Sequence, residues 1–109
     1  MEFKSEELQV RFTVPDHPTY RQLLAYDGAR DQQDTFYEKL WEGARAIIEE
    51  WECGFDAEIE TATEGKKKRL LDVDLDEQPI KDRALTVIKW AGYRCHSWRF
   101  SLDELPKNS

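Results

Sequence analysis

Residues 34–54 read DTFYEKLWEGARAIIEEWECG, and this stretch decides the fold class. Its apolar residues recur at intervals of three and four, namely Phe36, Leu40, Ala44, Ile47, Ile48 and Trp51. That spacing places them on one face of a helix. Asp34 or Thr35 can cap the first turn, and Gly54 follows the last apolar residue. The stretch therefore predicts a long amphipathic helix.

A second long helix is predicted near the C-terminal end of the sequence. Pro79 suits a first helical turn, because its missing N–H is not needed there. Apolar and small residues follow at helical spacing, namely Ala84, Ile88, Ala91, Cys95, Trp98 and Leu102. The adjacent Ala91 and Gly92 lack large side chains, so we expect the helix of residues 34–54 to pack closely against them.

The segment before residue 34 predicts a strand and a short helix. Residues 8–14 alternate apolar and polar side chains, which is typical of a strand with one buried face. Pro15 ends this strand. Thr19 and Gln22 form a capping-box pattern, and Gly28 suggests where the short helix ends.

Residues 56–77 lose helical periodicity. Two alternating runs flank a turn with Gly65, which fits a β-hairpin, and a mobile loop fits the polar composition equally well. The predicted fold is α+β, mainly α: two long amphipathic helices, a short helix, an N-terminal strand and this hairpin. We expect a single small globular domain over residues 1–109, with residues 106–109 as a loose tail.

The amino-acid composition excludes several classes of function. The chain has 109 residues, 16 Lys and Arg, 23 Asp and Glu, and a net charge of −7. Such a charge disfavours direct nucleic-acid binding, which depends on cations, and favours partners with a basic surface. No stretch is apolar enough for a membrane span, and we expect no signal peptide. With only two cysteines, too few for a disulfide framework, we expect an intracellular, reduced protein.

No residue pattern predicts catalysis, a cofactor or a metal. The acidic run from Asp72 departs from a calcium loop, because Arg83 stands where the bidentate Glu is needed. Cys53, Cys95 and the two histidines lack the close ligand pairs of zinc sites. On a helix Cys95 and His96 point in different directions, and Cys95 fits the apolar stripe. We expect no enzymatic activity.

The aromatic residues are the candidate binding residues. Aromatic side chains left at a surface are favoured interface anchors. The candidates for protein interaction are Trp41, Trp51, Trp90, Trp98 and Tyr37. The alternative is that the strand, the hairpin and the short helix cover the four indoles, and the sequence leaves both open.

Five phrases carry a resemblance to a known group: VRFTVPDHPTYRQLLAY (10–26), LWEGARAII (40–48), WEC (51–53), IKWAG (88–92) and SLDELPKN (101–108). Together they resemble small acidic proteins from the tail morphogenesis clusters of tailed phages and prophages. The functional group to compare is the tail assembly chaperones. Members are small and largely helical, and act on tail tube and tape measure proteins before assembly. No residue role carries over position by position.

The resemblance implies a non-enzymatic protein-interaction factor, a chaperone that binds tail tube or tape measure protein. The location that it implies is the cytoplasm of a bacterial host cell, or the virion. Two alternatives stay open. One is a structural tail or neck component that remains in the virion, where the strand of residues 8–14 adds to a neighbour's sheet. The other is an acidic inhibitor that mimics DNA phosphates, with acids between Glu49 and Glu64 facing a host DNA-binding protein. Homo-oligomer formation is also left open.

Overall fold

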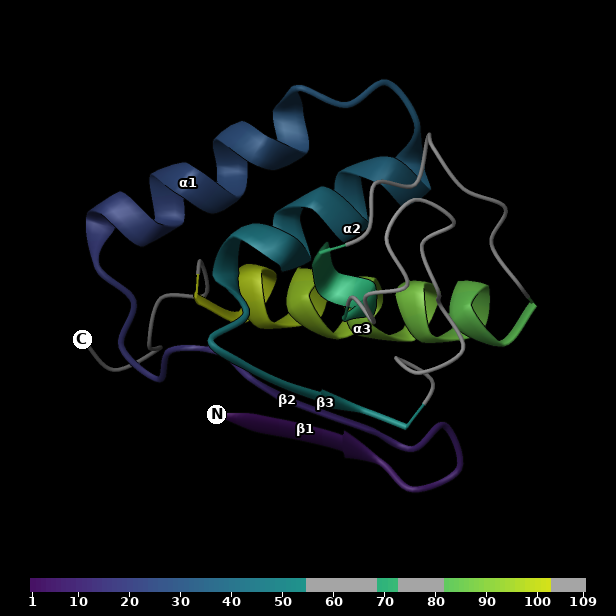
Figure 1. Cartoon of the computed structure of the whole chain (residues 1–109). Coiled ribbons are helices and arrows are strands. Elements are labelled where there is room, and N and C mark those ends of the chain that lie inside the picture. Colours follow the sequence, from purple (N-terminus) through teal and green to yellow (C-terminus); the bar gives the residue numbers. More distant parts are fainter. Residues whose placement is uncertain (55–68, 73–81, 103–109) are drawn as a thin grey trace.

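The chain forms a three-stranded antiparallel sheet with helices packed against one face (Figure 1). The computed structural model describes residues 1–54, 69–72 and 82–102. In chain order the elements are β1 (Glu2–Ser5), β2 (Val10–Thr13), α1 (Tyr20–Asp31), α2 (Phe36–Ile47), β3 (Glu50–Cys53), the 3-10 turn η2 (Leu70–Asp72) and α3 (Asp82–Leu102). The predicted α+β, mainly α class is confirmed.

β2 is the central strand, with β1 and β3 at its two sides. Phe12 pairs with Phe3 on β1 and with Trp51 on β3. Its side chain is fully buried beneath the helices, whereas Arg11 points to the outer face. The alternation predicted for residues 8–14 is therefore confirmed in β2.

β1 was not predicted from the sequence. Phe3 is its one apolar side chain packed against the core, so the strand shows little of the alternation of apolar and polar residues by which a strand is predicted. The pairing with β2 continues one step beyond the strand itself. The Met1 amino group donates a hydrogen bond to the Val14 carbonyl (2.8 Å), and the Val14 N–H donates to the Met1 carbonyl (2.9 Å). The backbone N–H and the carbonyl of Val14 are thereby both hydrogen-bonded.

The helix predicted over residues 34–54 is shorter than expected. Thr35 caps α2, accepting a hydrogen bond from the Glu38 N–H (3.4 Å). The helix ends at Ile47, because Ile48 adopts an extended backbone and the chain turns into β3. Trp51 therefore belongs to a strand, where pairing with β2 satisfies the backbone groups that a longer helix would have satisfied internally.

α1 packs antiparallel to α2 (Figure 1). The predicted capping box is confirmed: the Thr19 hydroxyl accepts from the Gln22 N–H (3.1 Å), and the Gln22 side chain accepts from the Thr19 N–H (2.8 Å). The predicted end at Gly28 is wrong, since α1 continues to Asp31. Nothing lies within 4 Å of a Cβ built on this glycine, so it has no packing role.

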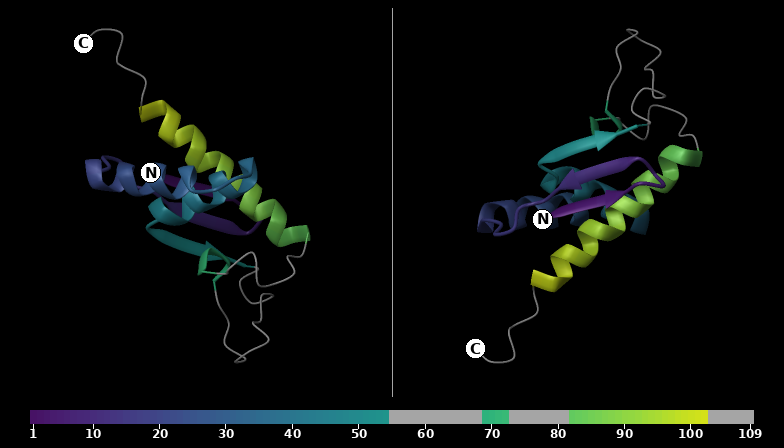
Figure 2. Two further views of the ribbon diagram at one scale, coloured as in Figure 1. Left: turned by 90° about the horizontal axis from the view of Figure 1, so that it is seen from above. Right: turned by 90° about the horizontal axis from the view of Figure 1, so that it is seen from below.

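α3 crosses the inner side of the sheet and contacts α2 (Figure 2). The predicted close approach is confirmed, because a Cβ on Gly92 would lie 3.0 Å from the Leu40 Cβ. Ala91 and Cys95 are buried as predicted, and Trp98, for which the sequence left burial and exposure open, is buried as well. Pro79 lies outside the described residues. None of the helices in the described ranges is both long and apolar enough to cross a lipid bilayer.

Most of the hairpin predicted within residues 56–77 lies outside the described residues. The exception is the short stretch around η2. Leu71, expected on a strand, lies in this 3-10 turn, so that part of the prediction is wrong. Leu70 and Leu71 are both buried, and the Arg45 side chain donates to the Leu71 carbonyl (2.8 Å), which fixes η2 against α2.

Candidate protein-interaction surface

Three of the four tryptophans named as interaction candidates belong to the core. Trp41, Trp51 and Trp98 are all buried. The Trp41 and Trp51 rings meet edge to face at 6.1 Å, and Trp98 meets Tyr26 at the same distance. These indoles cannot contact a partner in the folded state, so the structure supports the alternative in which the sheet and α1 cover them.

The other two candidates differ in exposure. Trp90 is half-buried, and its ring packs against Phe12 of the sheet at 5.5 Å. Tyr37 is exposed at the start of α2. Of the five candidates, Tyr37 is therefore the one best placed to contact a partner.

Tyr37 belongs to a larger group of neighbouring rings that we name the aromatic patch, formed by the exposed Phe36, Tyr37, Tyr93 and Phe100 and the half-buried His96. The rings are in contact, with centroid separations of 5.8 Å for Phe36–Tyr37, 5.9 Å for Phe36–Tyr93 and 4.5 Å for His96–Phe100. The exposed fractions are 52% for Phe36, 48% for Tyr37, 44% for Tyr93 and 56% for Phe100. The patch thus joins α2 to α3 at the surface.

Local structure explains why these side chains gather. The cap at Thr35 starts α2, so Phe36 and Tyr37 fall in its first turn, next to α3. On α3, Tyr93, His96 and Phe100 are three and four residues apart and form a stripe beside the buried one. This second stripe was not predicted, although its spacing of three and four residues is present in the sequence.

His96 lies at the centre of the patch, between Phe36 and Phe100. Burial lowers the pKa of its imidazole, and the charge of Arg30 on α1 lowers this pKa further. Its Nδ1 is buried and finds no hydrogen-bond partner among the described residues. Both observations favour the neutral imidazole, which keeps the middle of the patch uncharged near neutral pH.

The patch has charged groups at its margins. The Lys89 ammonium lies over the Tyr37 ring, 4.9 Å from its centroid. Arg30 pairs with Asp27 and Asp31. Asp34, just before the N-cap of α2, and Glu38, in its first turn, are exposed and flank Phe36 and Tyr37 in the sequence.

Cys95 and Tyr26 are titratable groups within the core. Burial raises the pKa of the Cys95 thiol, which keeps it protonated and poorly nucleophilic. Burial also raises the pKa of Tyr26 to about 12. Within the described ranges, no three His, Cys, Asp or Glu side chains are grouped so as to hold a metal ion.

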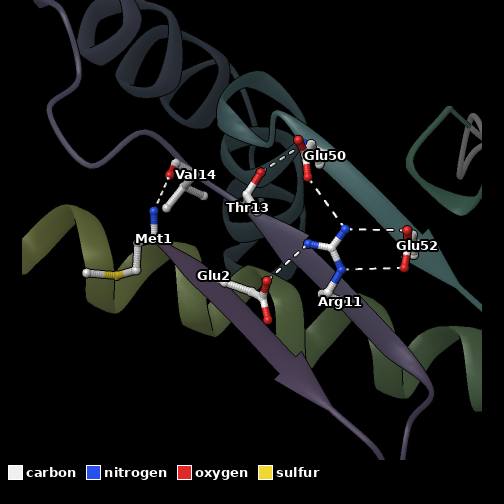
Figure 3. Close-up of polar contacts among 7 residues, drawn as sticks. All are labelled: Met1, Glu2, Arg11, Thr13, Val14, Glu50 and Glu52. Carbon is white, nitrogen blue, oxygen red and sulfur yellow. Dashed lines mark hydrogen bonds and ion pairs between the residues drawn. The ribbon is translucent and has the colours of Figure 1, made fainter.

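The outer face of the sheet is polar and centres on Arg11 (Figure 3). Its guanidinium contacts Glu2 (3.1 Å), Glu50 (3.5 Å) and Glu52 (3.4 Å). The pKa of Arg11 is raised mainly by the hydrogen bond with Glu52 and the charge of that carboxylate, and to a smaller extent by Glu2. Glu50 and Glu52 had been assigned to a DNA-mimicking surface, and Arg11 reduces their negative field.

The strand proposed to add to a neighbour's sheet in a virion component does not lie at an edge of its own sheet. The strand of residues 8–14 was expected to add to a neighbour's sheet. It is instead the central strand, and both of its sides are taken by β1 and β3. Any such pairing would have to use an outer strand.

With this geometry established, the chain was compared with known proteins. No match was found among protein-family models, curated proteins or solved structures. The function of this chain has therefore to be inferred from its own residues.

Proposed function

We propose that this protein is a non-enzymatic protein-interaction factor that binds tail tube or tape measure protein as an assembly chaperone. The observation that carries the proposal is the aromatic patch on α2 and α3. Aromatic side chains are enriched among residues that dominate binding energy at protein interfaces. The nature of the client comes from the resemblance of the sequence to proteins of phage tail clusters.

The size and stiffness of the patch support a binding role. The four Phe and Tyr residues of the patch are each about half exposed, which leaves roughly 400 Å² of contiguous aromatic surface. Contiguous apolar patches of this size are often functional sites. The tight packing of Gly92 against Leu40 fixes the two helices beneath it. A surface already in its binding shape loses little conformational entropy on association.

The overall charge is compatible with this role. A net charge of −7 makes copies of the chain repel one another. An exposed aromatic surface would otherwise promote self-association. A protein that must present such a surface until its client arrives benefits from this repulsion.

The test is a pull-down with the tagged chain from cells producing the phage, with mass spectrometry of both the lysate and purified particles. We expect tail tube or tape measure protein in the lysate fraction and none of this chain in the particles. The double variant Phe36→Ala/Phe100→Ala should lose the client. Tyr20→Ala, which removes an exposed aromatic side chain of α1, serves as the matched control and should retain it.

Other results would replace the proposal. Recovery of the chain in particles would identify a structural component. A basic DNA-binding protein as the main partner would favour the mimic of DNA phosphates. Client capture unaffected by the patch variant would show that the patch is not the binding surface.

A further inference from the structure

We propose that protonation of His96 divides the aromatic patch, so that acidification switches off binding at this surface. His96 is the ring that joins Phe36 on α2 to Phe100 on α3, with centroid separations of 6.3 Å and 4.5 Å. As a regulation of binding, this inference rests on the proposed function. The response of the patch itself belongs to the chain alone and can be measured without a client.

The continuity of the patch depends on His96. Phe36 contacts the rings of Tyr37 and Tyr93 as well as that of His96. Phe100, by contrast, contacts one aromatic ring within the described part of the chain, and that ring is His96. If the His96 side chain leaves its position, Phe100 is therefore separated from the other rings, and the patch loses its end on α3.

The position of the His96 ring suits the neutral imidazole and not the imidazolium ion. A neutral ring has one N–H and one acceptor nitrogen, whereas the imidazolium carries an N–H on both nitrogens. The Nδ1 atom is buried, and no described residue forms a hydrogen bond with it. A buried, charged N–H without an acceptor costs more than an edge-to-face ring contact contributes. We therefore expect the protonated ring to turn toward solvent, which its half-buried position on α3 permits.

The charges on α1 also oppose protonation. Burial lowers the pKa of His96 most, and the charge of Arg30 lowers it further. The two carboxylates beside Arg30 do not offset this effect, because both are paired with arginines. Asp31 pairs with Arg30, and Asp27 pairs with Arg30 and accepts two hydrogen bonds from Arg99.

Neither α2 nor α3 supplies a negative charge to stabilise the imidazolium. From α2, the group that meets the His96 ring is the apolar ring of Phe36. On α3 itself, Tyr93 stands three residues before His96, Arg99 three residues after it and Phe100 four residues after it. Among the described residues, no Asp or Glu forms an ion pair with His96. Every neighbouring helix thus favours the uncharged ring.

The first test is an NMR titration of the free protein with isotope-labelled His and Phe rings, from about pH 8 to about pH 4. We expect the titration midpoint of His96 to lie below its ordinary value of 6.5. Nuclear Overhauser contacts between the His96 and Phe100 rings should be present above the midpoint and lost below it. Far-ultraviolet circular dichroism over the same range should show that the helices remain folded.

Two variants separate His96 from the carboxylates that titrate in the same range. His96→Phe keeps an uncharged ring at this position, so its contact with Phe100 should persist to about pH 4. His17→Gln removes the other histidine, which is exposed, and should respond like the native chain.

Urea unfolding gives a second measurement on the native chain and His96→Phe. The unfolded native chain binds the His96 proton at the ordinary pKa of 6.5, and the folded chain binds it only at a lower pH. As the pH falls through this interval, the native chain should therefore lose stability relative to His96→Phe. Below the lowered pKa the difference should stay constant.

The regulation is tested by the client pull-down on either side of the measured His96 midpoint. We expect the native chain to retain at least about fivefold less client below the midpoint than above it. His96→Phe should retain similar amounts at both values of pH, because its patch stays continuous. His17→Gln should lose the client as the native chain does.

Several outcomes would overturn the inference. A His96 midpoint at or above 6.5, or a contact with Phe100 that persists below the midpoint, would show that protonation does not divide the patch. Equal loss of client from the native chain and from His96→Phe would assign the pH dependence to other groups. Client capture that does not depend on Phe36 and Phe100 would refute the proposed function, whereas the NMR titration would still decide how the free patch responds to acid.

Discussion

At the scale of single residues, two glycines in helices should respond oppositely to the same substitution. A Cβ on Gly92 would lie 3.0 Å from the Leu40 Cβ and 3.4 Å from its carbonyl carbon, whereas nothing lies within 4 Å of a Cβ on Gly28. Gly92→Ala should therefore destabilise the fold by about 1 kcal/mol, because crowding exceeds the gain in helix propensity. Gly28→Ala should stabilise it by about 0.5–1 kcal/mol. Urea unfolding of both variants measures the two changes, and a stabilising Gly92→Ala would contradict the packing.

The burial of individual aromatic side chains was the property that the sequence predicted least well. Trp41 and Trp98 were predicted to be buried or exposed with equal weight, because a helical stripe does not reveal what covers it. The structure buries both beneath neighbouring elements. Phe36 was assigned to the apolar face of its helix, and it is about half exposed because it occupies the first turn, beyond the reach of the core.

At the scale of elements, one ion pair ties α1 to α3. The Arg99 guanidinium donates to both oxygens of Asp27 (3.0 and 2.9 Å), and both side chains are mostly buried. Asp27→Asn should cost about 1–2 kcal/mol of unfolding free energy. The control Asp31→Asn removes a more exposed carboxylate and should cost less than about 0.5 kcal/mol.

The same pair predicts a pH dependence. The hydrogen bond from Arg99 lowers the pKa of Asp27 below its ordinary value of 3.8. The unfolded chain therefore takes up the proton first, and the stabilisation is complete above that value and lost as the pH falls through the lowered pKa. The stability difference between the native chain and Asp27→Asn should shrink below about pH 4. A constant difference down to pH 2 would contradict this assignment.

Helices and strands were predicted correctly where the sequence showed one periodicity, and wrongly where helical spacing and strand alternation overlapped. Residues Ile47, Ile48 and Trp51 continue the helical spacing of α2, yet Glu50–Cys53 also alternates polar and apolar. Only the pairing of this segment with β2, distant in sequence, decides in favour of the strand. The capping box at Thr19 needed no distant partner and was correctly predicted.

At the scale of the whole molecule, one core joins every major element. Trp41 of α2, Trp51 of β3 and Trp98 of α3 share it with Phe12 of β2 and Tyr26 of α1. We therefore expect a single cooperative transition, with tryptophan fluorescence and far-ultraviolet circular dichroism giving the same midpoint in urea. Two separate midpoints would show that the helices and the sheet unfold independently.

The central position of β2 also bears on how the chain acquires its structure. A short turn connects β1 to β2, whereas α1 and α2 lie between β2 and β3 in the sequence, so β3 is synthesised last of the three strands. Closing that long loop slows folding, because distant partners must meet before their contacts stabilise anything. A nascent chain that stops at Ile47 would leave the second edge of β2, with Val10 and Phe12, unpaired. Open apolar edges of this kind recruit strands from other molecules, so the interval before β3 emerges is when aggregation threatens most.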